Sequence, residues 1–149
     1  MVKGVCAFDL DQTFTCQNGD CSQSKLQSMK SAINHCKTND MGVVINTARP
    51  PQADVKHSVP TTVRNLLKGV PVYTRKRSCR NSVPEEKLKN MRRIARRYNV
   101  PLKNTILVDD LLETCNTLNN NGAIGIHVHR EDGMTNYEFK ALKKFVDKI

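Results

Sequence analysis

Short apolar segments alternate with amphipathic segments of helical length along this chain, and this alternation constrains the fold more than any other feature. Apolar runs of this kind are typical of strands buried on both faces of a sheet. The predicted strands are Val2–Leu10, Gly42–Asn46, Val70–Tyr73, Thr105–Val108 and Ala123–Val128. The predicted helices are Ser22–Lys37, Thr61–Lys68, a helix from Pro84 to Tyr98, Leu111–Asn119 and Asn136–Lys148.

Strands separated by helices predict a parallel sheet with right-handed crossovers. We therefore expect one domain, residues 1–149, with a three-layer Rossmann-like α/β fold of about five strands and helices on both faces. A chain of this length can bury roughly 70% of the surface that it exposes when unfolded. No apolar run approaches the length of about 20 residues that a membrane-spanning helix needs, and no signal peptide opens the sequence. These features predict a soluble intracellular protein, cytoplasmic by default, with no membrane partner.

The chain has six cysteines, which are Cys6, Cys16, Cys21, Cys36, Cys79 and Cys115. Without a secretory signal, free thiols are expected rather than a disulfide framework. No C-x-x-C pair occurs, and the spacing of Cys16 and Cys21 lacks the second pair that a structural zinc site normally needs. The cysteines therefore do not predict a metal site.

Acidic residues follow two of the predicted strands, at the sheet edge where ligands bind in parallel α/β folds. Asp9 and Asp11 leave the first strand, and Asp109 and Asp110 end the fourth. Carboxylates placed together at a buried strand end repel one another and lose hydration. A divalent cation removes that conflict, and oxygen ligands suit Mg²⁺.

Groups that bind anions are expected at the same edge. Thr47, Ala48 and Arg49 follow the second strand and offer a hydroxyl, backbone N–H groups and a guanidinium. Lys87 lies near the start of the helix that leads into the fourth strand, and that helix runs antiparallel to the strands. Each residue alone has a plain structural explanation as a turn, a helix cap or a solvated lysine. Their joint placement at one edge favours a functional site.

The order of these residues resembles the haloacid dehalogenase (HAD) superfamily. Its first motif, D-x-D-x-T, is matched by Asp9–Thr13, and its second, a Thr or Ser after strand two, by Thr47. The third, a lysine before the last motif, is matched by Lys87, with Lys89 as the alternative. The fourth, an acidic pair after an apolar strand, is matched by Asp109-Asp110. All four motifs occur in order, over almost the whole chain.

The resemblance implies a HAD-type phosphatase. Asp9 would be the nucleophile that forms an aspartyl-phosphate, and Asp11 would be the general acid and then the general base. Relatives that are dehalogenases lack the second aspartate, so its presence favours phosphoryl transfer. Lys87 would hold Asp9 ionised and would bind phosphate together with Thr47. Arg49 would also bind phosphate, although only some relatives have an arginine there.

The resemblance also implies a Mg²⁺ cofactor. Its ligands would be a carboxylate oxygen of Asp9, the backbone carbonyl of Asp11, and Asp110, with Asp109 direct or through water. Many relatives have Gly-Asp in the fourth motif and a further acidic residue about four positions on. Here the pair is Asp-Asp and position 114 is threonine, which leaves the ligand set open.

The spacing of the motifs leaves no room for the cap domain of large relatives. Only 33 residues separate Thr13 from Thr47, and 39 separate Thr47 from Lys87. The expected strands and helices use most of both segments. A capless site is open, which in this family goes with macromolecular substrates or with oligomers that cover each other's sites.

The net charge of +10 is concentrated in residues 75–97, which alone carry +8. Lys89, Arg92, Arg93, Arg96 and Arg97 lie opposite the apolar stripe of their helix, as on a solvated helix face. The basic residues that follow the third strand are instead expected at the active edge, as candidate substrate contacts: Arg75, Lys76, Arg77 and Arg80. Such a block suits nucleic acid, phosphorylated substrates or acidic surfaces.

Three hypotheses for the function remain. The first is a phosphatase for phosphorylated nucleic-acid ends, because Thr47-x-Arg49, the missing cap and the basic block resemble the phosphatase half of polynucleotide kinase-phosphatases. The second is a phosphatase for a small metabolite or nucleotide, with the site covered by oligomerisation. The third is a non-catalytic basic binding module, which the intact motifs disfavour.

Overall fold

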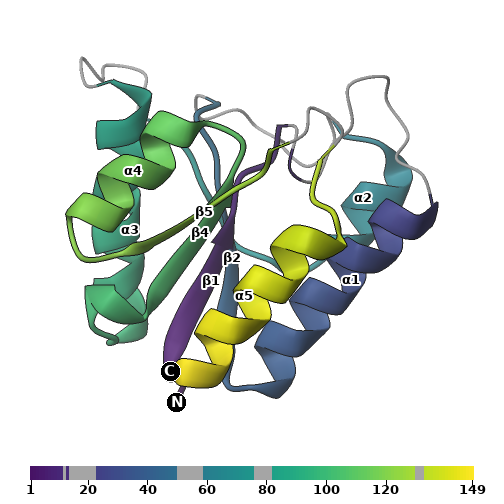
Figure 1. The fold of residues 1–149 in the computed structure, drawn as a ribbon, viewed down its shortest axis with the longest axis horizontal. Helices are drawn as coiled ribbons and strands as arrows, with labels where there is room; N and C mark the ends of the chain where they lie inside the picture. Colours follow the sequence, from purple (N-terminus) through teal and green to yellow (C-terminus); the bar gives the residue numbers. More distant parts are fainter. Residues whose placement is uncertain (12, 14–22, 50–58, 76–81, 130–132) are drawn as a thin grey trace.

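A parallel five-stranded sheet forms the centre of the molecule in the computed structural model (Figure 1). The structure describes residues 1–11, 13, 23–49, 59–75, 82–129 and 133–149. The strands are β1 (Gly4–Phe8), β2 (Met41–Asn46), β3 (Val72–Tyr73), β4 (Thr105–Asp109) and β5 (Ile124–His127). They lie in the order β3-β2-β1-β4-β5, so that β1 is central and β3 and β5 are the edges. The predicted Rossmann-like α/β fold is confirmed.

Helices cover both faces of the sheet. They are α1 (Gln23–Thr38), α2 (Thr61–Leu66), α3 (Val83–Tyr98), α4 (Leu112–Asn120) and α5 (Asn136–Lys148), with a short 3₁₀ helix η2 (Leu102–Asn104) before β4. Figure 1 shows α1, α2 and α5 on one face and α3 and α4 on the other. In the described part of the chain no cap domain is inserted between the motifs, and no helix is long and apolar enough to cross a lipid bilayer.

Alternate residues of β1 face two separate apolar cores, because successive side chains of a strand point to opposite faces. Cys6 and Phe8 belong to the core beneath α1, α2 and α5, whereas Val5 and Ala7 belong to the core beneath α3 and α4. Every residue of β1 and β2 is buried. This explains the continuous apolar runs in the sequence. Cys6, Cys36 and Cys115 are buried free thiols, as predicted, and the other cysteines lie outside the described residues.

The edge strand β3 is shorter than the sequence predicts. Val70 is not part of it, because its amide donates to the carbonyl of Leu67 and closes the turn after α2. Pro71 has no amide to donate, but its carbonyl accepts a hydrogen bond of 2.8 Å from Ile45 of β2. Only Val72 and Tyr73 then pair with β2. Val70, which the apolar pattern assigned to the strand, therefore belongs to the turn after α2.

Helix α3 begins and ends at residues with the expected capping chemistry. The Ser82 side chain accepts from the Glu85 amide, and Pro84 lies in the first turn. Asn99 ends the helix in the left-handed conformation, with φ of 54°. Because α3 runs antiparallel to the strands, its first turns lie at the carboxyl edge of the sheet.

Candidate active site

The two acidic motifs meet because β1 and β4 are hydrogen-bonded neighbours. Phe8 of β1 pairs with Val108 of β4, and the Asp9 amide donates to the Val108 carbonyl at 2.8 Å. Asp9 and Asp109 therefore leave adjacent strands at the same level. The sequence could predict that both lie at the carboxyl edge, and the strand order places them next to each other.

Lys87 of α3 joins the two aspartates. Its ammonium donates to Asp9 Oδ1 at 2.8 Å and also to Asp109 Oδ2. The side chains are 4% exposed for Lys87, 5% for Asp9 and 0% for Asp109. Lys89, the alternative motif lysine, is exposed on the same helix. The structure thus places Lys87, and not Lys89, in the acidic cluster.

Burial changes the acid–base behaviour of this cluster. It raises the pKa of Asp9 well above its usual value, with the charge of Asp109 acting in the same direction and that of Lys87 opposing it. Burial likewise raises the pKa of Asp109, against the influence of Lys87. Burial acts to lower the pKa of Lys87, but the charges of Asp9 and Asp109 outweigh it and the pKa is raised. Lys87 therefore stays protonated, but its single positive charge does not outweigh the effect of burial on the two carboxylates.

A third carboxylate completes a group that fits a metal ion. One oxygen each from Asp9, Asp109 and Asp110 lies within 4.8 Å of the others. Contact with Asp110 contributes to the raised pKa of Asp9 and of Asp109, after the larger effect of burial. Both oxygens of Asp109 accept protein hydrogen bonds, from Lys87 and, at 2.9 Å, from the Leu111 amide. An all-oxygen donor set of this kind suits Mg²⁺.

Thr47 lies at the same edge, directly after β2. It is 1% exposed, and its amide donates to the Tyr73 carbonyl at 2.9 Å. Its hydroxyl accepts a hydrogen bond of 3.2 Å from the Arg49 amide. Ala48, between them, is half-buried. The segment is thus held in a tight turn that keeps the Thr47 hydroxyl at the edge of the sheet.

Arg49 lies against Asp11 in this structure. Its Nε donates to Asp11 Oδ2 at 3.0 Å, and its Nη2 donates to Asp11 Oδ1, which makes a bidentate ion pair. The hydrogen bond with Asp11 raises the pKa of Arg49. The Asp11 side chain is nevertheless 51% exposed. Sequence reasoning assigned these residues to different tasks and did not predict that they pair.

Two buried asparagines that sequence reasoning missed hold the turn of α3 that carries Lys87. Asn46 Nδ2 donates to the Lys87 carbonyl at 3.1 Å, and Asn90 Nδ2 donates to Asn46 Oδ1 at 3.0 Å. Asn90 also donates to the Thr74 carbonyl at 3.2 Å. A polar residue at the end of the apolar run GVVIN was the available signal, because buried amides need partners.

The basic residues after β3 are only partly described. The Arg75 amide donates to the Arg49 carbonyl at 3.0 Å, which places Arg75 beside the Thr47–Arg49 turn. Lys76, Arg77 and Arg80 lie outside the described residues. The arginines on α3 are exposed, as predicted. Glu113 is exposed on α4 and Thr114 is buried, so neither adds a carboxylate to the cluster.

Comparison with known proteins identifies the fold. No protein-family profile and no curated protein sequence matches the chain. Among solved structures, an uncharacterized protein from Corynebacterium glutamicum superposes with a TM-score of 0.69 at 14% identity, over 99% of this chain and 96% of that one. A candidate HAD-like phosphatase from Mesorhizobium loti superposes with a TM-score of 0.55 at 13% identity, over 99% and 87% of the two chains.

A structure with magnesium and phosphate bound is also similar. The D,D-heptose 1,7-bisphosphate phosphatase from B. bronchiseptica superposes with a TM-score of 0.54 at 16% identity, over 97% of each chain. At these identities the comparison establishes the architecture. The fold expected from the four motifs is confirmed, and this chain has the HAD-like fold of those phosphatases.

Proposed function

We propose that the chain is a Mg²⁺-dependent phosphomonoester hydrolase that works through an aspartyl-phosphate on Asp9. The observation that carries this proposal is the buried Lys87 bridge between Asp9 and Asp109, with Asp110 beside both carboxylates. Buried groups with strongly perturbed pKa values at a sheet edge are typical of catalytic sites. The likeness to phosphatases of the same fold, one of them with magnesium and phosphate bound, supports the same conclusion.

Mg²⁺ would be held by Asp9, Asp110 and the backbone carbonyl of Asp11, with Asp109 acting directly or through water. When bound, it offsets the charge of the carboxylates and of the phosphate. Asp110 is the more suitable direct ligand of the pair, because Lys87 and the Leu111 amide already occupy both oxygens of Asp109.

In the first step Asp9 attacks phosphorus. Lys87 holds Asp9 Oδ1, so the other carboxylate oxygen is the one that attacks. A bond forms between that oxygen and phosphorus while the bond to the alcohol oxygen breaks, and Asp11 gives its proton to the leaving alcohol. Thr47 and the amides around Ala48 bind the non-bridging phosphate oxygens.

The Arg49–Asp11 pair is suited to couple substrate binding to proton transfer. In the free protein both oxygens of Asp11 are engaged by Arg49. A phosphate dianion competes for the same guanidinium and releases Asp11. The freed carboxylate, which is open to solvent, takes up a proton from water and then gives it to the leaving alcohol. In the second step Asp11 takes a proton from water as the water oxygen attacks phosphorus. The bond to Asp9 breaks and inorganic phosphate leaves.

Two substrate classes are candidates. Phosphorylated nucleic-acid ends are favoured by the net charge of +10 and by Arg75 beside the Thr47–Arg49 turn. A small metabolite or nucleotide, with the site covered by a second copy of the chain, is favoured by the likeness to the heptose bisphosphate phosphatase over nearly the full length of both chains.

The test of the chemistry is the variant Asp9→Asn, assayed with p-nitrophenyl phosphate and Mg²⁺. We expect turnover to fall by at least about 10³-fold, because the amide cannot act as the nucleophile. Asp40→Asn is the matched control, because Asp40 is exposed and its left-handed backbone conformation tolerates asparagine. Turnover by folded Asp9→Asn protein at the wild-type rate would refute the assignment.

The test of the substrate is a panel of phosphate esters assayed with Mg²⁺. It includes 3′- and 5′-phosphorylated oligonucleotides, nucleotides and sugar phosphates. The nucleic-acid hypothesis requires that kcat/KM be highest for an oligonucleotide. Activity confined to small esters would favour the metabolite hypothesis. If the specific activity and the molecular mass of the assembly both rise over the same range of protein concentration, a site shared between copies is supported.

A further inference from the structure

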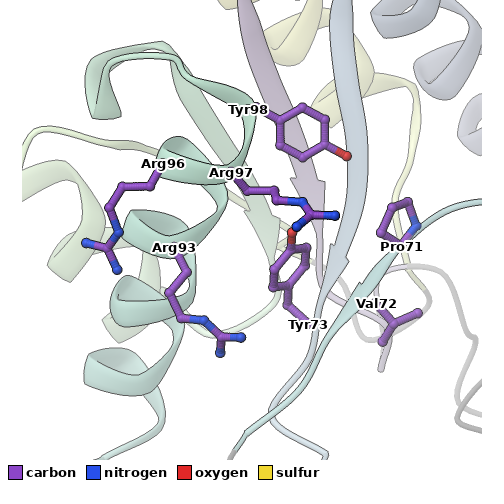
Figure 2. Close-up of a pocket in the computed structure, with 7 residues that line it drawn as sticks. All are labelled: Pro71, Val72, Tyr73, Arg93, Arg96, Arg97 and Tyr98. Carbon is purple, nitrogen blue, oxygen red and sulfur yellow. The ribbon is translucent and has the colours of Figure 1, made fainter.

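A pocket of about 740 Å³ lies between the edge strand β3 and the last turns of α3 (Figure 2). Tyr73 and Tyr98 contribute aromatic rings, and Pro71 and Val72 line the side formed by the edge strand. Arg93, Arg96 and Arg97 extend from α3. None of the seven described residues that line the pocket is acidic. The pocket therefore combines aromatic surface with concentrated positive charge.

Two of the arginines lie close to the tyrosine rings. The Arg93 guanidinium lies 5.8 Å from the centroid of the Tyr73 ring, within the range of a cation–π interaction. Figure 2 shows Arg97 extending between the rings of Tyr73 and Tyr98. Tyr98 is fixed by packing, because a Cβ atom at Gly42 of β2 would lie only 2.9 Å from its ring. The pocket is thus formed in the protein alone.

Solvation of the helix face explains why these arginines are exposed, but it does not explain the tyrosines. Three guanidiniums around one pocket repel each other, and a bound polyanion would offset that repulsion. Many proteins that bind unpaired nucleic-acid strands combine aromatic rings, on which bases stack, with cationic side chains that pair with the phosphates. We propose that this pocket binds a single strand of nucleic acid.

The pocket is connected to the candidate active site along two elements. Arg97 lies ten residues after Lys87 on α3, about 15 Å at 1.5 Å per residue. On the sheet side, Tyr73 is followed by Thr74 and Arg75, and the Arg75 amide is bonded to the Arg49 carbonyl. A phosphorylated strand end at Asp9 would pass Arg75 and reach the pocket.

The position of the pocket therefore favours nucleic acid over small metabolites as the substrate class, and this part of the inference rests on the proposed function. Asn90 lies between the two sites: it donates to Thr74 and to Asn46, and it accepts from Arg93 Nη1 at 3.3 Å. A small ester bound at Asp9 would not extend to Tyr98. Only a chain-like substrate uses both sites.

The experiment measures binding of a fluorescent 12-nucleotide single strand without terminal phosphate, as DNA and as RNA, by anisotropy in EDTA. We expect Arg93→Ala/Arg97→Ala to bind at least about tenfold more weakly at low salt. Its slope of log K against log salt should be smaller by about 1.4, because each phosphate contact to a single strand contributes about 0.7. Tyr73→Leu should weaken binding about tenfold and leave the slope unchanged, because it removes stacking but no charge.

The matched control is Lys143→Ala/Lys144→Ala on α5, which removes the same charge from an exposed position on the opposite face of the sheet. Its binding and slope should stay close to wild type. Equal loss in both double variants, or no loss in Tyr73→Leu, would overturn the proposal. Because the strand carries no terminal phosphate and no Mg²⁺ is present, failure of p-nitrophenyl phosphate turnover would refute the proposed function alone.

Discussion

Replacing Lys87 by methionine removes the cation that compensates the buried carboxylates. Methionine has a similar length and can fill the space of the lysine side chain, so the main change is the loss of charge and hydrogen bonds. Asp9 and Asp109 each lose the hydrogen bond from the ammonium. Both remain buried, and Asp110 stays in contact with them.

The expected loss of stability is large for a single substitution. Removing one partner of a buried ion pair typically costs about 3–5 kcal/mol. The total free energy of unfolding for a domain is about 5–15 kcal/mol. For a protein of this size, 1 kcal/mol changes Tm by about 2–4 °C. We therefore expect Tm to fall on the order of 10 °C at neutral pH in EDTA.

The size of the loss should depend on pH. Burial raises the pKa of Asp9 and of Asp109, so their contribution to stability is greatest when both are protonated and is lost as pH rises through the raised pKa values. Lys87 opposes both shifts, and its removal raises both pKa values further. The difference in Tm between Lys87→Met and wild type should thus be small near pH 5 and grow towards pH 8.

Thermal unfolding followed by circular dichroism across this pH range measures the effect. Lys89→Met is the matched control, because Lys89 is an exposed lysine on the same helix, and its Tm should stay within about 2 °C of wild type. A Lys87→Met protein as stable as this control at pH 8, or equally destabilised at both pH values, would refute the electrostatic account of the cluster.

Three further substitutions or treatments test other parts of the structure. Arg49→Ala should raise KM for p-nitrophenyl phosphate about tenfold or more, because Arg49 is proposed to move from Asp11 to the phosphate; an unchanged KM would show that the pair is only structural. Asn46→Ala should lower the free energy of unfolding by about 1–3 kcal/mol in urea titrations, because it removes the hydrogen bonds that the Asn46 side chain makes with the Lys87 carbonyl and with Asn90, and a neutral effect would contradict this network. Burial raises the pKa of Cys115 to about 12, so iodoacetamide at pH 8 should label it in urea but not in the native protein, as read by peptide mass spectrometry; rapid native labelling would be inconsistent with its burial.

The sheet edge could be predicted because its signals are local. Apolar runs mark the strands. Asp9 and Thr47 directly follow β1 and β2, and Asp109 is the last residue of β4, so a parallel sheet gathers these residues at one edge. Lys87 could also be predicted at this edge, because it lies near the start of a crossover helix that begins there. The strand order β3-β2-β1-β4-β5 then makes the two acidic motifs neighbours.

The pairings between side chains could not be predicted in the same way. The Arg49–Asp11 ion pair and the Asn46–Asn90 bond join residues 38 and 44 positions apart, and no pattern in either segment specifies the partner. The arginines on α3 were predicted as a solvated face, and they are exposed. The pocket beside them is lined by Tyr73 of β3 and by Tyr98 of α3, which packs on Gly42 of β2, and no pattern in the sequence specifies this placement.

The route of the chain between Lys87 and Asp109 limits how this protein can vary in length. The two residues are 22 positions apart and touch, because α3 carries the chain away from the active edge and β4 brings it back. One residue inserted into α3 after Lys87 would rotate the Lys87 side chain by about 100° and shift it by about 1.5 Å relative to the rest of the helix. The ammonium would then leave the aspartates although every side chain of the cluster was still encoded. Insertions should therefore be tolerated least within α3. They should be tolerated best outside the segment from Lys87 to Asp109, as at Asn121 and Gly122 between α4 and β5.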